Sequence, residues 1–151
     1  MLNDIIKIIG AVELVLRGPD GRIKRRLKIP NLVVTAGKVF IAASMAKTTV
    51  NTPAAMTHMA VGTLNTAPVV GDTTLAAEVA ASRTALGSTT PSSATIIYVC
   101  TFGAGVGTGA LVEAGIFNAG AAGTMLCRSI FSVINKAAGD SLVITWTITI
   151  S

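Results

Sequence analysis

The chain has few of the side chains on which most enzyme active sites depend. Its 151 residues include one histidine, two cysteines, one tyrosine, one tryptophan and seven carboxylates. Charged residues make up only 13% of the chain, about half of the usual share. Cys100 and Cys127 form no C-x-x-C pair and have no metal-ligand spacing, so we expect buried free thiols in a reducing cytoplasm.

No catalytic set can be assembled around the single histidine. Nothing near His58 in the sequence supplies an orienting carboxylate, so a packed or surface histidine is the better interpretation. The glycine-rich stretch 103–110 partly matches a dinucleotide-binding pattern, but a strand follows it where that motif needs a helix. The carboxylates are scattered, without a pair suited to hydrolysis. We therefore predict that the protein is not an enzyme and has no cofactor, metal or small-molecule substrate.

Long apolar runs are also missing. No stretch approaches the roughly 20 apolar residues of a membrane helix, so we expect no membrane contact. Asp4 and Lys7 interrupt the apolar N-terminus, which has no small-residue cleavage site, so we expect it to be retained. Yet hydrophobic residues form 51% of the chain, and its mean hydropathy is +0.69. Such a composition predicts that part of the surface is buried in an assembly.

The strongest periodicity lies in residues 141–150. Every second residue from Leu142 to Ile150 is large and apolar, with Trp146 in the middle, and the residues between are Val or Thr. We expect these side chains to share a core with Tyr98 and Phe131. Because an apolar edge strand would be prone to aggregation, we expect this strand to be central in its sheet.

Turn-forming residues divide the rest of the chain into further short strands. A short helix is expected over 35–47, capped by Thr35, with Val39 and Phe40 on its inner side. Residues 73–86 fit a helix or an extended segment, and 87–93 is expected to be a linker. The sequence thus predicts an all-β fold, an antiparallel β-sandwich that is jelly-roll-like and carries one or two short helices. Strands are expected at 11–17, 22–29, 56–62, 94–102, 110–118, 124–134 and 141–150.

We divide the chain into an N-terminal arm, 1–10, and a single β-sandwich domain, 11–151. The arm has too little sequence around it to form a core of its own. We therefore expect it to bind a partner, either by adding to a neighbouring sheet or by filling a groove. Its apolar side chains are Ile5, Ile6, Ile8 and Ile9.

The domain begins with a basic hairpin, 11–29. Residues 1–47 hold nine basic and three acidic side chains, a net +6, whereas 48–151 hold three and four, a net −1. This hairpin could be a solvated strand face, a nucleic-acid site, or a surface that docks on an acidic protein. It lacks interleaved aromatic residues, which makes nucleic acid the less favoured partner. The face predicted to bind a partner carries Arg22, Lys24, Arg26 and Lys28.

One carboxylate interrupts an apolar strand. Glu113 lies between Val112 and Ala114, where a buried charge would need a partner. Arg128, in the next expected strand, is the natural partner, since cross-strand charge pairs stabilise sheets. We predict a structural ion pair rather than a general acid.

Five blocks of the sequence carry a resemblance to a known family. The blocks are 31–37 (Asn-Leu-Val-Val-Thr-Ala-Gly), 60–63 (Ala-Val-Gly-Thr), 113–118 (Glu-Ala-Gly-Ile-Phe-Asn), 123–128 (Gly-Thr-Met-Leu-Cys-Arg) and 144–148 (Ile-Thr-Trp-Thr-Ile). Together they resemble small virion structural proteins of tailed bacteriophages. That family includes capsid decoration (cement) proteins with jelly-roll-like sandwiches, and related blocks occur in tail-fibre and appendage proteins. The resemblance covers roughly residues 31–151, and the first thirty residues are less similar.

The resemblance implies a protein that is made in the host cytoplasm and located on the phage head surface. Such a protein would bind the major capsid protein and copies of itself, bridging capsid subunits and stabilising the shell. Each contact can be modest, because a repeating lattice makes the binding multivalent. A tail-fibre, collar or head-appendage protein is the alternative, and a nucleic-acid-binding module comes third.

Overall fold

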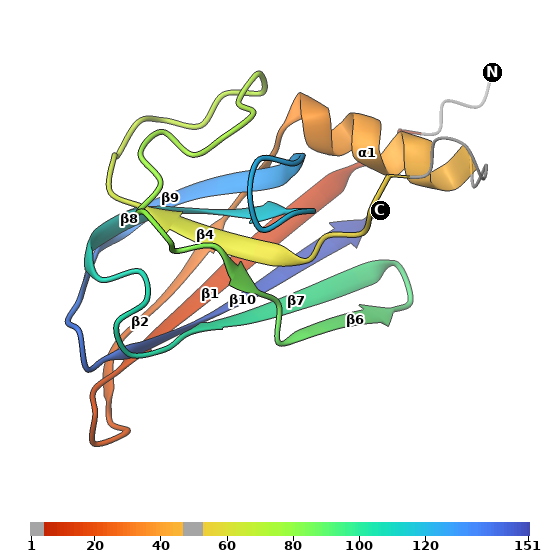
Figure 1. Cartoon of the computed structure of the whole chain (residues 1–151). Helices are drawn as coiled ribbons and strands as arrows, with labels where there is room; N and C mark the ends of the chain where they lie inside the picture. The colour runs from red at the N-terminus through yellow and green to blue at the C-terminus, as the bar shows by residue number, and fades with distance from the viewer. Residues whose placement is uncertain (1–4, 47–52) are drawn as a thin grey trace.

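In the computed structural model, which describes residues 5–46 and 53–151, the chain forms a two-layer β-sandwich (Figure 1). The described residues form two five-stranded sheets, β2-β1-β10-β7-β6 and β3-β9-β8-β4-β5, and one helix, α1, which lies at one end of the sandwich. The elements are β1 (Ile8–Arg17), β2 (Ile23–Pro30), β3 (Leu32–Val33), α1 (Thr35–Ala46), β4 (His58–Gly62), β5 (Thr84–Ala85), β6 (Ser88–Ser92), β7 (Thr95–Phe102), β8 (Gly109–Phe117), β9 (Met125–Lys136) and β10 (Ser141–Ile150).

The strands pair in a nested order. The first strand of the chain pairs with the last, β1 with β10, and moving inward β3 pairs with β9, β4 with β8 and β6 with β7, all antiparallel. A long hairpin rolled onto itself produces this order. Strands β2 and β5 lie outside the nested pairs, each at the edge of one sheet. The predicted all-β antiparallel sandwich is confirmed.

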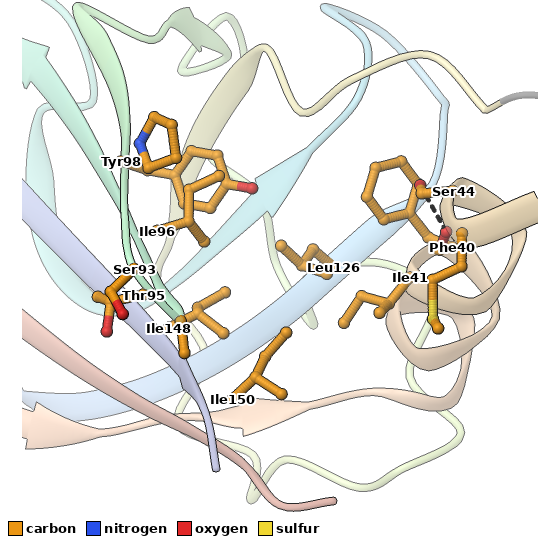
Figure 2. Close-up of a pocket in the computed structure, with 13 residues that line it drawn as sticks. Phe40, Ile41, Ser44, Ser93, Thr95, Ile96, Tyr98, Leu126, Ile148 and Ile150 are labelled. Atoms are coloured by element: carbon orange, nitrogen blue, oxygen red, sulfur yellow. Dashed lines mark hydrogen bonds between the residues drawn. The ribbon is translucent and has the colours of Figure 1, made fainter. Parts of the chain in front are cut away.

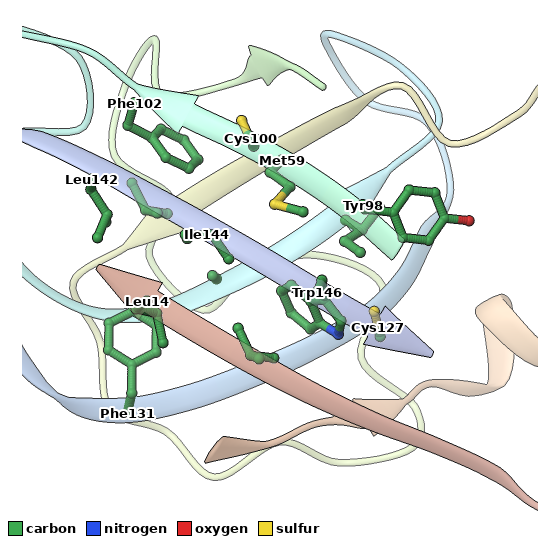
Figure 3. Close-up of a cluster of buried hydrophobic side chains, with 14 of the residues drawn as sticks. Leu14, Met59, Tyr98, Cys100, Phe102, Cys127, Phe131, Leu142, Ile144 and Trp146 are labelled. Carbon is green, nitrogen blue, oxygen red and sulfur yellow. The ribbon is translucent and has the colours of Figure 1, made fainter. Parts of the chain in front are cut away.

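Strand β10 is central, as predicted, and supplies much of the core. It pairs with β1 on one side and β7 on the other. Leu142, Ile144 and Trp146 are fully buried, and Tyr98 and Phe131 pack in the same cluster (Figure 3). Ile150, by contrast, is 43% exposed because it lies at the open end of the sandwich.

The predicted arm boundary at residue 10 is wrong. Strand β1 begins at Ile8, which is paired with Ile150 and packs against the core. Lys7 and Ser151 exchange two backbone hydrogen bonds, of 2.6 and 2.9 Å. Since β10 extends to Ile150, it offers pairing groups to residues 8–10, which therefore belong to the sheet. Ile5 and Ile6 precede the strand, and residues 1–4 of the predicted arm lie outside the described part of the chain.

Helix α1 is oriented by one glycine. A Cβ on Gly37 would lie 2.0 Å from the carbonyl oxygen of Leu126, so only glycine allows this approach to β9. Phe40 and Ile41, three and four residues later, share the inner face. Val39 points away and is 62% exposed, which corrects the prediction that it faces inward.

The predicted helix cap is shifted by one residue. The Val34 carbonyl accepts the first helical hydrogen bond, from the Lys38 amide at 3.0 Å, so Val34 occupies the cap position. The amide of Thr35 is satisfied by the Val70 carbonyl at 2.7 Å, which places a distant loop beside the start of the helix.

Residues 73–86, for which the sequence allowed a helix or an extended segment, are extended with turns. They contain β5 and are held by a hydrogen bond from the Val79 amide to the Val61 carbonyl at 2.9 Å. The segment expected to be a linker contains β6, which pairs with β7. Its polar residues and Pro91 suit an edge strand, where a missing amide proton costs no ladder hydrogen bond.

Candidate functional site

The predicted contact between Glu113 and Arg128 is present. The Nη2 and Nε atoms of Arg128 lie 2.8 and 2.9 Å from Glu113 Oε2. The side chain of Glu113 is 0% exposed and that of Arg128 is 2% exposed. The charges therefore meet inside the protein, on the face of the second sheet that is covered by the chain segment after β4.

The ion pair belongs to a larger cluster that the sequence did not indicate. Arg128 Nη1 lies 2.8 Å from Asp72, and Glu113 accepts hydrogen bonds from the amides of Ala76 and Ala77 at 3.0 and 2.7 Å. Burial acts to raise the pKa of Asp72, but the Val69 amide and the Arg128 guanidinium outweigh it and lower the pKa. The cluster fastens the loop that follows β4 onto the second sheet. Nothing in the sequence around Asp72 predicts this contact, since 56 residues separate it from Arg128.

The predicted basic face is partly neutralised within the chain. Lys24 donates to the buried carboxylate of Asp140 at 2.7 Å. Arg26 lies 3.7 Å from Glu13, and Arg22 lies 3.7 Å from Asp20. Of the four basic residues predicted to bind a partner, three therefore have intramolecular carboxylate partners.

Two other cations of β2 are more available. Lys28 and Arg25 are exposed and, among the described residues, have no carboxylate partner. Arg25 is paired with Leu16, so it emerges from the inner face at the sheet edge. It shares that face with Leu27 and Ile29, but its edge position lets the guanidinium reach solvent. Arg25 and Lys28 are thus the free cations of this strand.

The exposed edge of β2 resists the addition of another strand. It carries charged side chains, an inward-pointing cation at Arg25 and a terminal Pro30, and its pairing with β1 shifts register between Leu16 and Arg17. All four features are devices by which natural sheets avoid edge-to-edge pairing. The strand is better suited to electrostatic contact than to extending a sheet.

Apolar side chains are exposed at the end of the sandwich that carries α1. Val39 and Met45 on the helix are 62% and 78% exposed, and Ile5 and Ile6 beside the termini are 74% and 70% exposed. Val70, whose carbonyl binds the start of α1, is 53% exposed. We call the region formed by Ile5, Ile6, α1 and Val70 the apolar end.

A groove opens at the apolar end between α1 and the first sheet (Figure 2). Its volume is about 380 Å³, and its lining contains no charged residue. Tyr98 lies in its wall with the hydroxyl on the side that faces Phe40, and burial raises the pKa of this group to about 12. The other main lining residues are Phe40, Ile41, Leu126, Ile96, Ile148 and Ile150.

The other residues considered in the sequence analysis as candidates for chemistry are His58, Cys100 and Cys127. His58 Nδ1 lies 2.8 Å from the hydroxyl of Thr57. Cys100 and Cys127 are buried free thiols, as predicted, and burial raises the pKa of both. Within the described ranges, no group of three or more His, Cys, Asp or Glu side chains is placed to hold a metal ion. Over the same ranges, no helix has the length and apolar character to cross a membrane.

Comparisons with family models, curated proteins and solved structures find no significant match to this chain.

Proposed function

We propose that the protein is a structural component of a tailed-phage head, which decorates the outer surface of the shell and stabilises it. The observation that carries the proposal is the character of α1. Its twelve residues include a single charged side chain, Lys38, and it is apolar on its outer as well as its inner face. A helix that is apolar all round is normally covered, so the exposed Val39 and Met45 indicate a surface that another protein covers.

Two surfaces with different chemistry support a bridging role. The apolar end provides area for a close contact with capsid subunits or with other copies. The free cations Arg25 and Lys28 lie on β2, whose turn with β1 is at the opposite end of the molecule (Figure 1). They would attract an acidic surface and speed the encounter. A molecule with one contact at the apolar end and another along the β2 edge can join neighbouring subunits of a lattice.

The resemblance of residues 31–151 to phage virion proteins directs the proposal to the head. The predicted contact residues Ile5, Ile6, Arg22, Lys24, Arg26 and Lys28 remain part of it, with the distinction that Lys28 and the newly found Arg25 carry the free charge. Ile8 and Ile9, which were also predicted to contact a partner, are the first residues of β1 and do not belong to a separate arm.

Imaging an intact particle that contains the chain tests this function. A regular array over the shell supports decoration, whereas a few copies at one vertex would make it a collar or appendage protein. A second measurement compares the heat resistance of shells with and without the protein. Equal melting of decorated and stripped shells would refute the stabilising role.

The apolar face of α1 can be tested separately. Val39→Asp places a charge on that face, at a side chain that is 62% exposed and does not line the groove, so the fold should persist. We expect at least a tenfold loss of shell binding. Leu64→Asp, at a 49% exposed residue of a loop, is the matched control and should bind normally.

A further inference from the structure

The groove at the apolar end is continuous with the hydrophobic core. Tyr98, Leu126 and Ile148 belong to the core cluster and also line the groove, so the space between the sheets continues to the surface. Phe40 and Ile41 of α1 form the opposite wall (Figure 2). Apolar walls left in contact with water are unfavourable, and an apolar group that enters such a space is stabilised.

The size of the groove indicates what would fill it. A cavity of about 150 Å³ lined by aliphatic and aromatic side chains holds a benzene molecule. The volume here, about 380 Å³, would accept more than two groups of that size. Two adjacent branched aliphatic side chains meet this requirement. The hydroxyl of Tyr98 could donate one hydrogen bond to the main chain of the segment that carries them.

Such a segment lies at the same end of the molecule. Ile5 and Ile6 are adjacent, branched and largely exposed. Lys7 is fixed to Ser151 by two backbone hydrogen bonds, just beyond the groove residue Ile150. In its own chain the segment continues past the end of the sheet, and its side chains remain in solvent. The groove and the segment that could fill it are thus close in space but not engaged.

The charge distribution favours the apolar end as the place where a second copy can approach. Each chain carries a formal net charge of +5, so most approaches between two copies are repulsive. The groove lining is uncharged, and the β1–β2 turn, next to the basic residues, is at the far end (Figure 1). Two copies that meet at their apolar ends keep their basic hairpins apart. Because segment and groove are at the same end, each copy can also give and receive one segment across a twofold axis.

We infer that Ile5 and Ile6 of one copy insert into the groove of a second copy, and that the exchange is reciprocal. The inference deepens the proposed function, on which it rests for the presence of many copies side by side. It assigns the N-terminal apolar segment and the groove side of α1 to self-association, and it leaves the outer face of α1, which carries Val39, and strand β2 for contact with the shell.

The first test measures the mass of the full chain in solution by analytical ultracentrifugation. We expect a dimer, with twice the 15.3 kDa of one chain, and a dissociation constant that rises at least tenfold in the Ile5→Asp, Ile6→Asp variant. Leu64→Asp is the control for an added charge at an exposed aliphatic residue. A wild-type protein that stays monomeric overturns the inference, as does a double variant that dimerises normally.

The second test blocks the groove. Ser44→Trp introduces a large ring from the groove side of α1, whereas Ala42→Trp adds the same ring at an exposed helix residue outside the groove lining. We expect the first variant to be monomeric and the second to dimerise. Equal dimerisation of the two variants would show that the groove is not the binding site.

Mixing the two defective variants provides the decisive observation. The Ile5→Asp, Ile6→Asp copy retains its groove, and the Ser44→Trp copy retains its segment. A 1:1 mixture can therefore form one of the two reciprocal contacts, and we expect a heterodimer although neither variant dimerises alone. A mixture that remains monomeric, while both variants melt like the wild type, would overturn the exchange.

Failure of the proposed function gives a different result. If the protein dimerises through the groove but is absent from phage particles, the inference stands and head decoration fails. If the wild-type protein covers shells but is monomeric in solution, decoration stands and the exchange fails.

Discussion

Arg128 and Glu113 form a 2.8 Å ion pair although they do not lie opposite each other on their strands. Arg128 is paired with Gly115, and Glu113 with Ile130, so the charges meet along the diagonal of the ladder. A diagonal pair of this kind is within reach of a long side chain such as arginine.

Removing the guanidinium should cost far more than removing both charges. Arg128→Met leaves the buried Glu113 carboxylate without its cation, and we expect a loss of about 3–5 kcal/mol in unfolding free energy. In the double variant with Glu113→Gln, the neutral amide oxygen can still accept from Ala77, so we expect part of the stability to return. Urea melts of the three proteins give the comparison. A single variant as stable as the wild type would contradict the prediction.

The sequence predicts those features that depend on near neighbours. Alternation of apolar and β-branched residues identified β10, and a charge inside an apolar strand was enough to predict a partner for Glu113. The contacts that were missed join distant residues: Lys24 and Asp140 are 116 positions apart, and Asp72 and Arg128 are 56 apart. Periodicity carries no information about such pairs, because the three-dimensional arrangement of the loops determines them.

The orientation of α1 was beyond sequence reasoning for a related reason. Eight of the twelve helix residues are apolar, and they are spread around the helix, so the pattern does not distinguish an inner from an outer face. The close approach of Gly37 to the Leu126 carbonyl selects the orientation, and that approach is a tertiary contact. The same uniformity hid the exposed apolar face on which the proposed function depends.

Trp146 should be the most costly core side chain of β10 to truncate. It is fully buried between the sheets, and we expect Trp146→Ala to lose about 3–5 kcal/mol in denaturant melts. Its indole nitrogen has no hydrogen-bond partner in the described part of the chain, so Trp146→Phe should be considerably milder. Thr147→Ala, on the outer face of the strand, is the matched control and should stay within about 0.5 kcal/mol of wild type. A loss below about 1 kcal/mol for the alanine variant would mean that the indole is not packed as described.

Gly37→Ala should detach or displace α1. The added methyl group would lie 2.0 Å from the Leu126 carbonyl oxygen, a backbone atom that cannot move aside cheaply. The helix must then shift away from β9 and open the groove wall formed by Phe40 and Ile41. We expect a lower melting temperature and greater binding of a hydrophobic dye. Ala42→Gly, on the exposed side, tests whether helix propensity alone explains the change, since it should cost only about 1 kcal/mol.

Acid should destabilise the protein through two carboxylates. Hydrogen bonding by Lys24 and by the Ala137 amide lowers the pKa of Asp140 below its ordinary 3.8, and the pKa of Asp72 is also lowered. A folded-state pKa below the unfolded value means that the stabilisation is present above pH 3.8 and is lost as the pH falls below it. Asp140→Asn should therefore lower stability near neutral pH and flatten its acid dependence. A pH profile of the variant parallel to that of the wild type would show that Asp140 does not contribute.

The free and the paired cations of β2 should respond differently to substitution. Arg25→Gln with Lys28→Gln removes the two exposed charges that lack partners, so we expect unchanged stability but slower, less salt-sensitive binding to undecorated shells. Lys24→Ala instead leaves the buried Asp140 carboxylate without its cation, and its main effect should be a lower melting temperature. Salt-dependent co-sedimentation and thermal melts of both variants separate the two effects. Full shell occupancy by the double variant at every salt concentration would exclude the β2 cations from docking. Tight binding of the wild type to DNA, weakening steeply with salt, would instead favour the nucleic-acid alternative for the same strand.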